Sequence, residues 1–320
     1  MARDPAHPLP FDGAITRYFE DAAPAPVRWD KLLEELWHKP LMLAIPVLAW
    51  AVPPQVARAV QVMVVVGAVV GLYAVFQHFT GQDLVRGGTT TPEGGRYLAV
   101  GFFDHHLTYG GHVMMLLVMA GAWLLLRPDW RSVRAGGVLV VAGLLAIALL
   151  ASFARSAQLG ALVGALVIVA NQPPGRRPWS LAACGAAIAT ALSIPAFRQR
   201  AAQILEAGSE STRLNLWESS LAGIAARPWL GWGRGNFGAL MERHEVPGAY
   251  EARGHSHNDL LMQAVDAGVF GLLLYVALLV ATGVIIWHRR HRIGSLSWVP
   301  IGVVAMLLGL SIAGLFQVYQ

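Results

Sequence analysis

The side chains best suited to chemistry gather in the stretch HSHNDLLMQAVDAG, where polar residues run directly into an apolar segment. His257 and Asn258 precede that segment, and Asp259, Gln263 and Asp266 recur within it at helical spacing. Histidine can act as a general base near neutral pH, and polar groups at the mouth of an apolar helix usually face a wet cavity or a protein interior. A plain helix cap with buried polar neighbours is the alternative, and the sequence leaves both open.

Three arginines stand where they could bind an anion, because a planar guanidinium matches the oxygens of a phosphate. Arg155 lies between two apolar runs in SFARSAQLGALVG, Arg213 falls in the first turn of a predicted helix, and Arg234 stands among the glycines of GWGRGNFG. Simpler roles stay open for each. Arg155 could snorkel to lipid headgroups, Arg213 could pair with Glu210, and Arg234 could mark a tight turn, since no P-loop lysine follows.

A metal site is a weaker alternative at the same place. His105 and His106, in GFFDHHLTYGG, are expected on the same side of the membrane as His257. Their spacing is not the compact one of zinc sites, so no metal and no other cofactor is predicted. The single cysteine, Cys184, excludes a disulfide within the chain.

The composition places these residues in a membrane protein. The chain of 320 residues is 55% hydrophobic and only 13% charged, whereas soluble domains are about 25% charged. Its formal net charge of +5 comes from basic clusters between apolar runs, which sets membrane orientation and does not indicate nucleic acid binding. Residues 1–30 contain no apolar core of a cleavable signal peptide.

Apolar runs long enough for helices predict an all-α, polytopic transmembrane bundle of seven or eight spans. The runs are 41–52, 56–79, 108–126, 136–153, 156–171, 179–195, 260–287 and 298–318. The predicted organisation is a polar tail over 1–40, transmembrane helices over 41–195, a long periplasmic loop over 196–259 and C-terminal transmembrane helices over 260–320.

Arginine-rich loops give the orientation, because positive loops stay on the cytoplasmic side. Three such loops alternate with the long segment 196–259, which together with 80–107 and the tip near Arg155 is predicted to face the periplasm. Within 196–259, apolar residues recur at helical spacing, and Ser211 or Thr212 could cap the helix that they form. The recurring residues are Leu214, Trp217, Leu221 and Ile224, with Pro228 after the helix end. This helix either lies on the membrane surface or packs on a core of the loop itself.

The ordered set of motifs resembles the O-antigen ligase and O-antigen polymerase family of bacterial membrane glycosyltransferases. The stretches that carry the resemblance are GFFDHHLTYGGH, SFARSAQLGALVG, TRLNLWESSLAGIAARPWLGWGRGNF and HSHNDLLMQAVDAGVFGLLLY. Together they cover roughly residues 60 to 315. Two features depart from the family pattern: Asp266 replaces the usual glutamate, and the family usually has ten or more spans.

The resemblance implies a C-type glycosyltransferase fold in the bacterial inner membrane, with a metal-independent, inverting site that faces the periplasm. The donor would be a glycan on undecaprenyl diphosphate, and the acceptor lipid A-core or a saccharide. Arg155 and Arg213 would hold the diphosphate and His257 would activate the acceptor hydroxyl. Asn258, Gln263, Asp266, Arg234 and His106 are expected to support the site.

Other functions remain open from the sequence. A polysaccharide polymerase and a protein O-oligosaccharyltransferase would use the same motifs with another acceptor. A small-anion transporter would place polar residues at the bilayer midplane in repeated broken helices, whereas here they crowd one face. A scaffold without activity would tolerate the loss of His257.

Overall fold

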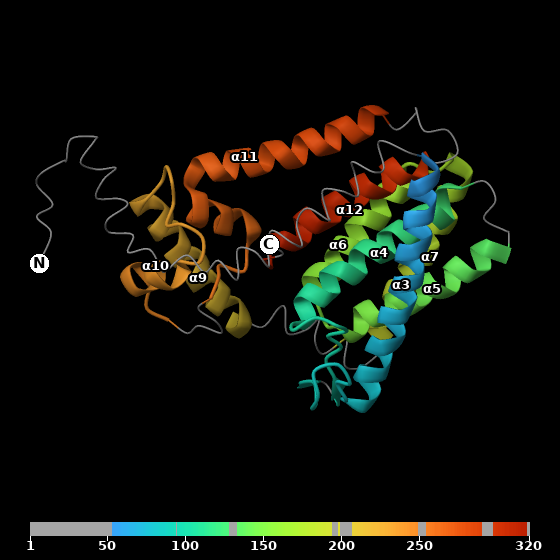
Figure 1. The fold of residues 1–320 in the computed structure, drawn as a ribbon, viewed down its shortest axis with the longest axis horizontal. Coiled ribbons are helices and arrows are strands. Elements are labelled where there is room, and N and C mark those ends of the chain that lie inside the picture. Colours follow the sequence, from blue (N-terminus) through green and yellow to red (C-terminus); the bar gives the residue numbers. More distant parts are fainter. Residues whose placement is uncertain are drawn as a thin grey trace, which may run out of the picture.

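The computed structural model describes residues 53–93, 95–127, 133–193, 198, 207–248, 254–289 and 297–318. These residues are mostly helical, with a single two-stranded antiparallel pair among them (Figure 1). The helices are α3 (Pro53–Thr80), α4 (His106–Leu126), α5 (Val133–Ala151), α6 (Arg155–Ala170), α7 (Arg177–Ser193), α9 (Ala207–Ala226), α10 (Phe237–His244), α11 (Asp259–Arg289) and α12 (Trp298–Gly314), with a 3₁₀ turn, η1 (Pro174–Arg176). The strands are β1 (Pro92–Glu93) and β2 (Arg96–Tyr97).

A helix is present at each of the seven predicted apolar runs that fall within the described residues. The last of them is shorter than predicted, because α12 ends at Gly314 and residues 315–318 turn away. The predicted tail over 1–40 and the run 41–52 lie outside the described residues.

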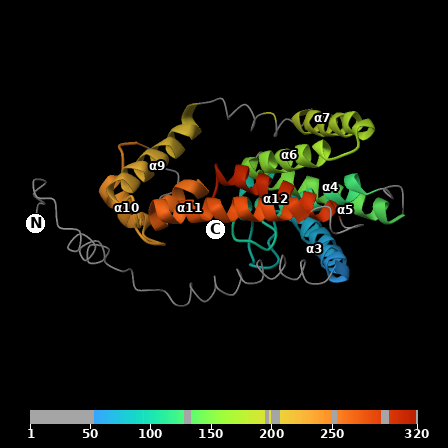
Figure 2. The same ribbon diagram turned by 90° about the horizontal axis from the view of Figure 1, so that it is seen from above.

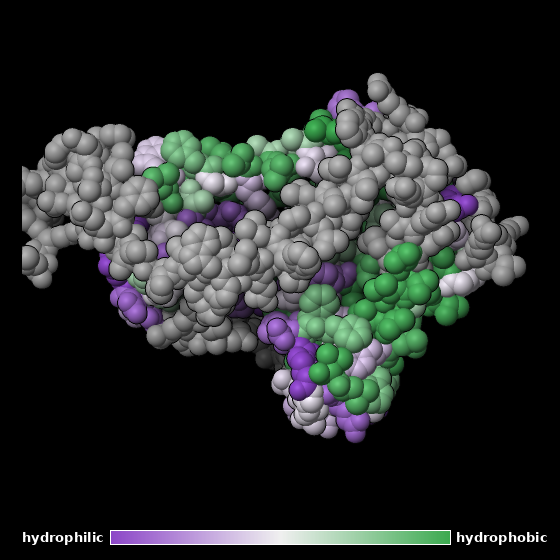
Figure 3. Space-filling view, in the orientation of Figure 1, coloured by the Kyte–Doolittle hydropathy of each residue, from purple (hydrophilic) through white to green (hydrophobic). Residues whose placement is uncertain are grey.

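Two helices of the described chain are long and apolar enough to cross a membrane: His106–Leu126 and the stretch Asp259–His288 of α11. The remaining apolar helical stretches have 10–17 residues, and 17 residues reach only about 25 Å of an apolar layer that is about 30 Å thick. Hydrophobic side chains cover the visible faces of α11 and of the region around α3 and α5 (Figure 3). The full multi-pass bundle therefore stays a prediction.

The tightest packing lies where α12 meets α6 and α4. A Cβ added at Gly160 of α6 would lie 2.5 Å from the carbonyl oxygen of Gly309 on α12, and the reverse substitution would meet Gly160 equally closely. One turn along α6, a Cβ at Gly164 would lie 2.7 Å from Val118 of α4. Small residues let backbones approach, which is how helices associate where lipid removes the hydrophobic drive between them.

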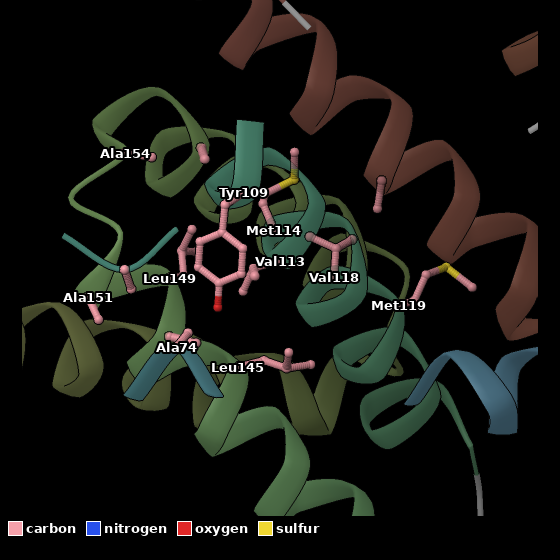
Figure 4. Packing of buried hydrophobic residues seen from close by; sticks show 14 of the residues in the cluster. Ala74, Tyr109, Val113, Met114, Val118, Met119, Leu145, Leu149, Ala151 and Ala154 are labelled. Carbon is pink, nitrogen blue, oxygen red and sulfur yellow. The ribbon is translucent and has the colours of Figure 1, made fainter. Parts of the chain in front are cut away.

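The core of this bundle surrounds the fully buried Tyr109 of α4 (Figure 4). Its ring lies among Ala74 of α3, Val113 of the same helix, and Leu145 and Leu149 of α5. The first turn of α4 is therefore anchored by apolar contacts with two neighbouring helices, and the residues just before it inherit a fixed position.

The segment between α3 and α4 is held by polar contacts. The buried amide of Gln77 accepts hydrogen bonds from the backbone N–H groups of Val100 and Gly101, at 3.2 and 2.7 Å. Burial alone would raise the pKa of the Asp83 carboxyl, but hydrogen bonds from Tyr73, Arg86 and two backbone N–H groups outweigh it and lower the pKa to about 2. Residues 81–93 and 95–105 thus form a cap over one end of the bundle.

A second unit contains α9, α10 and the first turns of α11, and both ribbon views place it beside the bundle (Figures 1 and 2). Its own core centres on Trp232 and consists of Leu216, Trp232, Phe237, Leu240, Met241, Met262 and Val265. The predicted helix of the long loop therefore packs on a core of the loop itself. The side chains of Leu214 and Leu221 are 54% and 56% exposed, so part of the predicted apolar face is not the buried one.

Helix α11 is broken at Gly268, whose φ of 66° and ψ of −167° are not helical. The freed carbonyl oxygens of Val265 and Asp266 accept hydrogen bonds from the N–H groups of Trp232 and Gly233, at 2.6 and 3.0 Å. The loop after α9 therefore inserts its backbone into the break. This kink was not predicted from the apolar pattern, which runs through it without interruption.

Candidate functional site

The turn before α11 is capped by Asn258, which was one of the two alternatives that the sequence left open. The Asn258 side-chain oxygen accepts a hydrogen bond from the N–H of Leu261 at 3.0 Å, three residues into the helix entrance. The same amide donates to the carbonyl oxygen of Leu315 at 3.1 Å, just beyond the end of α12. Asn258 therefore joins the start of α11 to the end of α12.

Two further contacts join the start of α11 to the end of α12 and the residues after it. Nδ1 of His257 lies 3.0 Å from Oε1 of Gln317, whose side chain is 4% exposed. Asp259 is buried and packs so closely on Gly314 that a Cβ there would meet its carboxyl group. Three consecutive residues, 257–259, thus contact the last turn of α12 and the residues after it. Gln317 was not among the predicted site residues, although a lone glutamine at the end of an apolar run was a usable signal.

His255 lies against His257, with ring centroids 4.1 Å apart. Burial, together with the neighbouring His257 and His105 imidazoles, lowers the pKa of His255 to about 4. His255 is therefore uncharged at neutral pH. Because the His105 imidazole contributes to this lowered pKa, the start of α4 also lies near this turn.

His105 and His106 connect this region to the tip between α5 and α6. Their rings lie 4.7 Å apart, and Nδ1 of His106 is 2.7 Å from the carbonyl oxygen of Ser152. Among the described residues, no group of three or more His, Cys, Asp or Glu side chains could hold a metal ion. The two histidines instead lie at the N-terminus of α4, where His105 accepts a hydrogen bond from the N–H of Leu107.

Arg155 is the first residue of α6, at the tip of a helical hairpin as predicted. The turn before it is built tightly: the buried Ser152 hydroxyl donates to the carbonyl oxygen of Leu149 at 2.7 Å and accepts from the N–H of Ala154 at 3.2 Å. The Arg155 side chain is half-buried. Its positive charge lies at a helix N-terminus, which is a position that favours anions. Binding an anion there would therefore be favourable.

The backbone is strained at two places in this region. Of the non-glycine residues that the structure describes, Phe153 and His257 have positive φ angles, 53° and 52°. Such conformations cost on the order of 1–3 kcal/mol each and persist only where the surroundings enforce them, which happens most often at functional sites. One strained residue lies two positions before Arg155, and the other is the predicted base.

Arg213 lies on α9, but not where the sequence placed it. The helix begins at Ala207 and runs through Ser211 and Thr212, so Arg213 is its seventh residue and lies beyond the first turn. The prediction that Ser211 or Thr212 caps the helix is wrong. The four residues before Ser211 also belong to the helix, and none of them is a proline. Arg213 therefore has no access to the free N–H groups of that helix end.

A neighbour of Arg213 still links α9 to the histidine turn. Trp217 lies one helical turn further along and donates its indole N–H to the carbonyl oxygen of Ser256 at 3.0 Å. Positions four apart share a helix face, so Arg213 and Trp217 point to the same side of α9. Arg213 is half-buried there.

The remaining predicted site residues take supporting positions. Arg234 is exposed on the turn that Gly233 and Gly235 form with positive φ angles, which confirms a tight turn. Gln263 and Asp266 are half-buried on the first turns of α11. The backbone of Asp266, through its bond to Gly233, helps to hold the loop in the helix break.

Comparison with known protein families gives a match to part of the chain. Residues 140–276 match a protein family described as O-antigen ligase. The matched segment contains Arg155, Arg213 and His257, together with the α5–α6 tip and the break in α11. No curated protein matches the chain significantly. The match covers less than half of the chain and supports a relation to the O-antigen ligase family.

Proposed function

We propose that this protein transfers a glycan from undecaprenyl diphosphate to lipid A-core or a saccharide acceptor, at the periplasmic face of the bacterial inner membrane. Arg155 and Arg213 bind the diphosphate, and His257 removes the proton of the acceptor hydroxyl. The reaction inverts the anomeric centre and uses no metal, because the two guanidinium groups carry the charge stabilisation that a divalent cation supplies elsewhere.

The observation that carries the proposal is a continuous set of contacts at one end of the molecule. His106 joins the Arg155 tip through Ser152. The His105 imidazole contributes to lowering the pKa of His255, whose ring meets that of His257 edge to face. Trp217 joins the Arg213 face of α9 to Ser256, the residue before His257. Residues far apart in the sequence are thereby tied to one region, and two of the three segments carry a strained backbone.

The chemistry balances with these groups. The acceptor oxygen attacks the anomeric carbon and forms the new glycosidic bond while its proton passes to His257. The bond from that carbon to the diphosphate oxygen breaks, and the electron pair leaves with undecaprenyl diphosphate. Negative charge grows on the leaving group, where fixed guanidinium groups at low dielectric stabilise it most effectively.

Complementation tests the proposal. In a bacterial strain that lacks its own copy, the wild-type chain should restore surface polysaccharide on a gel, and Arg155→Ala, Arg213→Ala and His257→Ala should each fail. Loss of general-base catalysis alone costs about 10²–10⁴-fold in rate. Failure of lipid attachment identifies a ligase, and failure of chain elongation identifies a polymerase.

A matched control is Arg177→Ala. Arg177 begins α7, beyond the far end of α6, so about 24 Å of helix separates it from the Arg155 tip. This variant should restore polysaccharide fully. If His257→Ala also restores it at wild-type level while present in equal amount in the membrane, the enzymatic assignment is wrong.

A further inference from the structure

Gln317 is a buried polar side chain that none of the proposed catalytic steps uses. It follows α12 by three residues and its side chain is 4% exposed. The side-chain oxygen Oε1 lies 3.0 Å from Nδ1 of His257. The amide is oriented with its oxygen toward the ring, and a carbonyl oxygen can only accept a hydrogen bond. In this orientation the neutral imidazole carries its proton on Nδ1.

We propose that Gln317 is a positioning residue that holds His257 in the Nδ1–H tautomer and thereby leaves Nε2, which is buried in this structure, as the nitrogen that can accept a proton. This inference rests on the proposed role of His257 as the base. Catalytic histidines commonly depend on a third group that bonds the far ring nitrogen and fixes both tautomer and orientation. Here the third group would be the side-chain amide of Gln317, which is neutral and lies 60 positions after His257 in the chain.

The backbone around Gln317 is fixed from both sides. Before it, the carbonyl oxygen of Leu315 accepts a hydrogen bond from the Asn258 side-chain amide, and Gly314 packs on Asp259. After it, Val318 packs against the core around Trp232. The Gln317 amide therefore has little freedom to move away from the imidazole, which is what a positioning group needs.

A neutral partner also suits the surroundings of His257. The titratable groups near it are His255 in the same turn, His105 at the start of α4 and the carboxyl of Asp259 on α11. A carboxylate at position 317 would favour the protonated imidazole and remove the base at neutral pH. An amide fixes the tautomer without adding charge.

Two variants separate orientation from charge. Gln317→Met keeps the length of the side chain but removes the acceptor. We expect kcat to fall about 10–100-fold with KM nearly unchanged, because part of the general-base contribution of about 10²–10⁴-fold is lost. Gln317→Glu keeps the acceptor and adds charge. It should retain the Nδ1–H tautomer and move the acidic limb of the pH–rate profile to higher pH.

The tautomer is read directly by ¹⁵N NMR of the His257 ring in detergent-solubilised protein, without any activity assay. At a pH above that at which the imidazolium loses one of its two ring protons, the wild type and Gln317→Glu should show Nδ1–H, and Gln317→Met should show a mixture of tautomers. Gln172→Met is the control: this buried glutamine bonds the Leu125 carbonyl oxygen at the opposite end of the bundle. It should change neither the His257 spectrum nor the pH profile.

The inference is overturned if Gln317→Met folds with the wild-type tautomer and the wild-type kcat. It is also overturned if Gln317→Glu leaves the acidic limb where it was. Failure of the proposed function looks different: His257→Ala would then retain transfer activity, whereas the NMR spectra would still show whether Gln317 sets the tautomer.

Discussion

The helical bundle and the unit around α9 and α10 are held together in different ways. In the bundle, α6 and α12 touch backbone to backbone through Gly160 and Gly309, and the surrounding core is rich in alanine. In the other unit, large side chains fill the core and indole N–H groups bond to backbone carbonyls. Trp232, for example, donates to the carbonyl oxygen of Gly223 at 2.9 Å.

The difference explains where the site lies. The bundle is a close-packed support that holds the Arg155 tip, while the smaller unit brings Arg213 and the histidine turn to it. The contacts between the end of α12 and the start of α11 are mostly polar, as His257 with Gln317 and Asn258 with Leu315 illustrate. The proposed site at this junction would combine a half held by close helix packing, around Arg155, with a half that polar contacts orient.

The largest effect is expected where the bundle is tightest. Gly160→Leu would force α6 away from α12, because even a Cβ would lie 2.5 Å from the Gly309 carbonyl oxygen. We expect a loss of about 3 kcal/mol or more in the free energy of unfolding. Thermal unfolding in detergent measures it. Gly143→Leu on α5 is the control, since nothing lies within 4 Å of a Cβ there. Equal melting temperatures for the two variants would contradict the close helix contact.

A smaller effect should follow at the helix break. Gly231 has a φ of 69°, and a Cβ there would lie 2.6 Å from the backbone nitrogen of Gly268. Gly231→Ala should therefore release the loop from α11 and increase hydrogen exchange at Trp232 and Gly233. Gly235→Ala is the control, with a φ of 82° and nothing within 4 Å. It should show only the backbone penalty of about 1–2 kcal/mol; equal exchange in both variants would argue against insertion of the loop.

The smallest expected effect is a dependence of stability on pH that arises from His255 in the turn before α11. The pKa of His255 falls from 6.5 to about 4 on folding, so between these values the unfolded chain binds a proton that the folded one does not. Stability should fall as pH falls through this window, and His255→Asn should reduce the slope, to which His244, with a pKa that burial lowers, also contributes. Chemical denaturation in detergent at a series of pH values measures this. Asp83 titrates lower, from 3.8 to about 2, so any slope left in the variant below pH 4 belongs to the cap over α4. An unchanged slope between 6.5 and 4 would contradict the burial of His255.

Much of the site was predictable because its parts are local. The helix starts at Asp259 and Arg155 follow from abrupt changes between polar and apolar residues, and Asn258 is a standard cap. Arg155 and His257 were recognisable as chemically distinctive residues at such boundaries, whereas Arg213 lies inside α9. The start of α9 was not predictable, since a serine or threonine able to cap a helix can equally lie inside one.

The sequence by itself determined the helical class, the positions of the apolar helices and the polar end of each, since these depend on composition and spacing along one segment. Only the tertiary structure decided which residues meet. The contact of Gln317 with His257 spans 60 positions, and the break at Gly268 exists because a distant loop satisfies the two carbonyl groups that it frees. Both depend on hydrogen-bond partners from elsewhere in the chain, which no local pattern encodes.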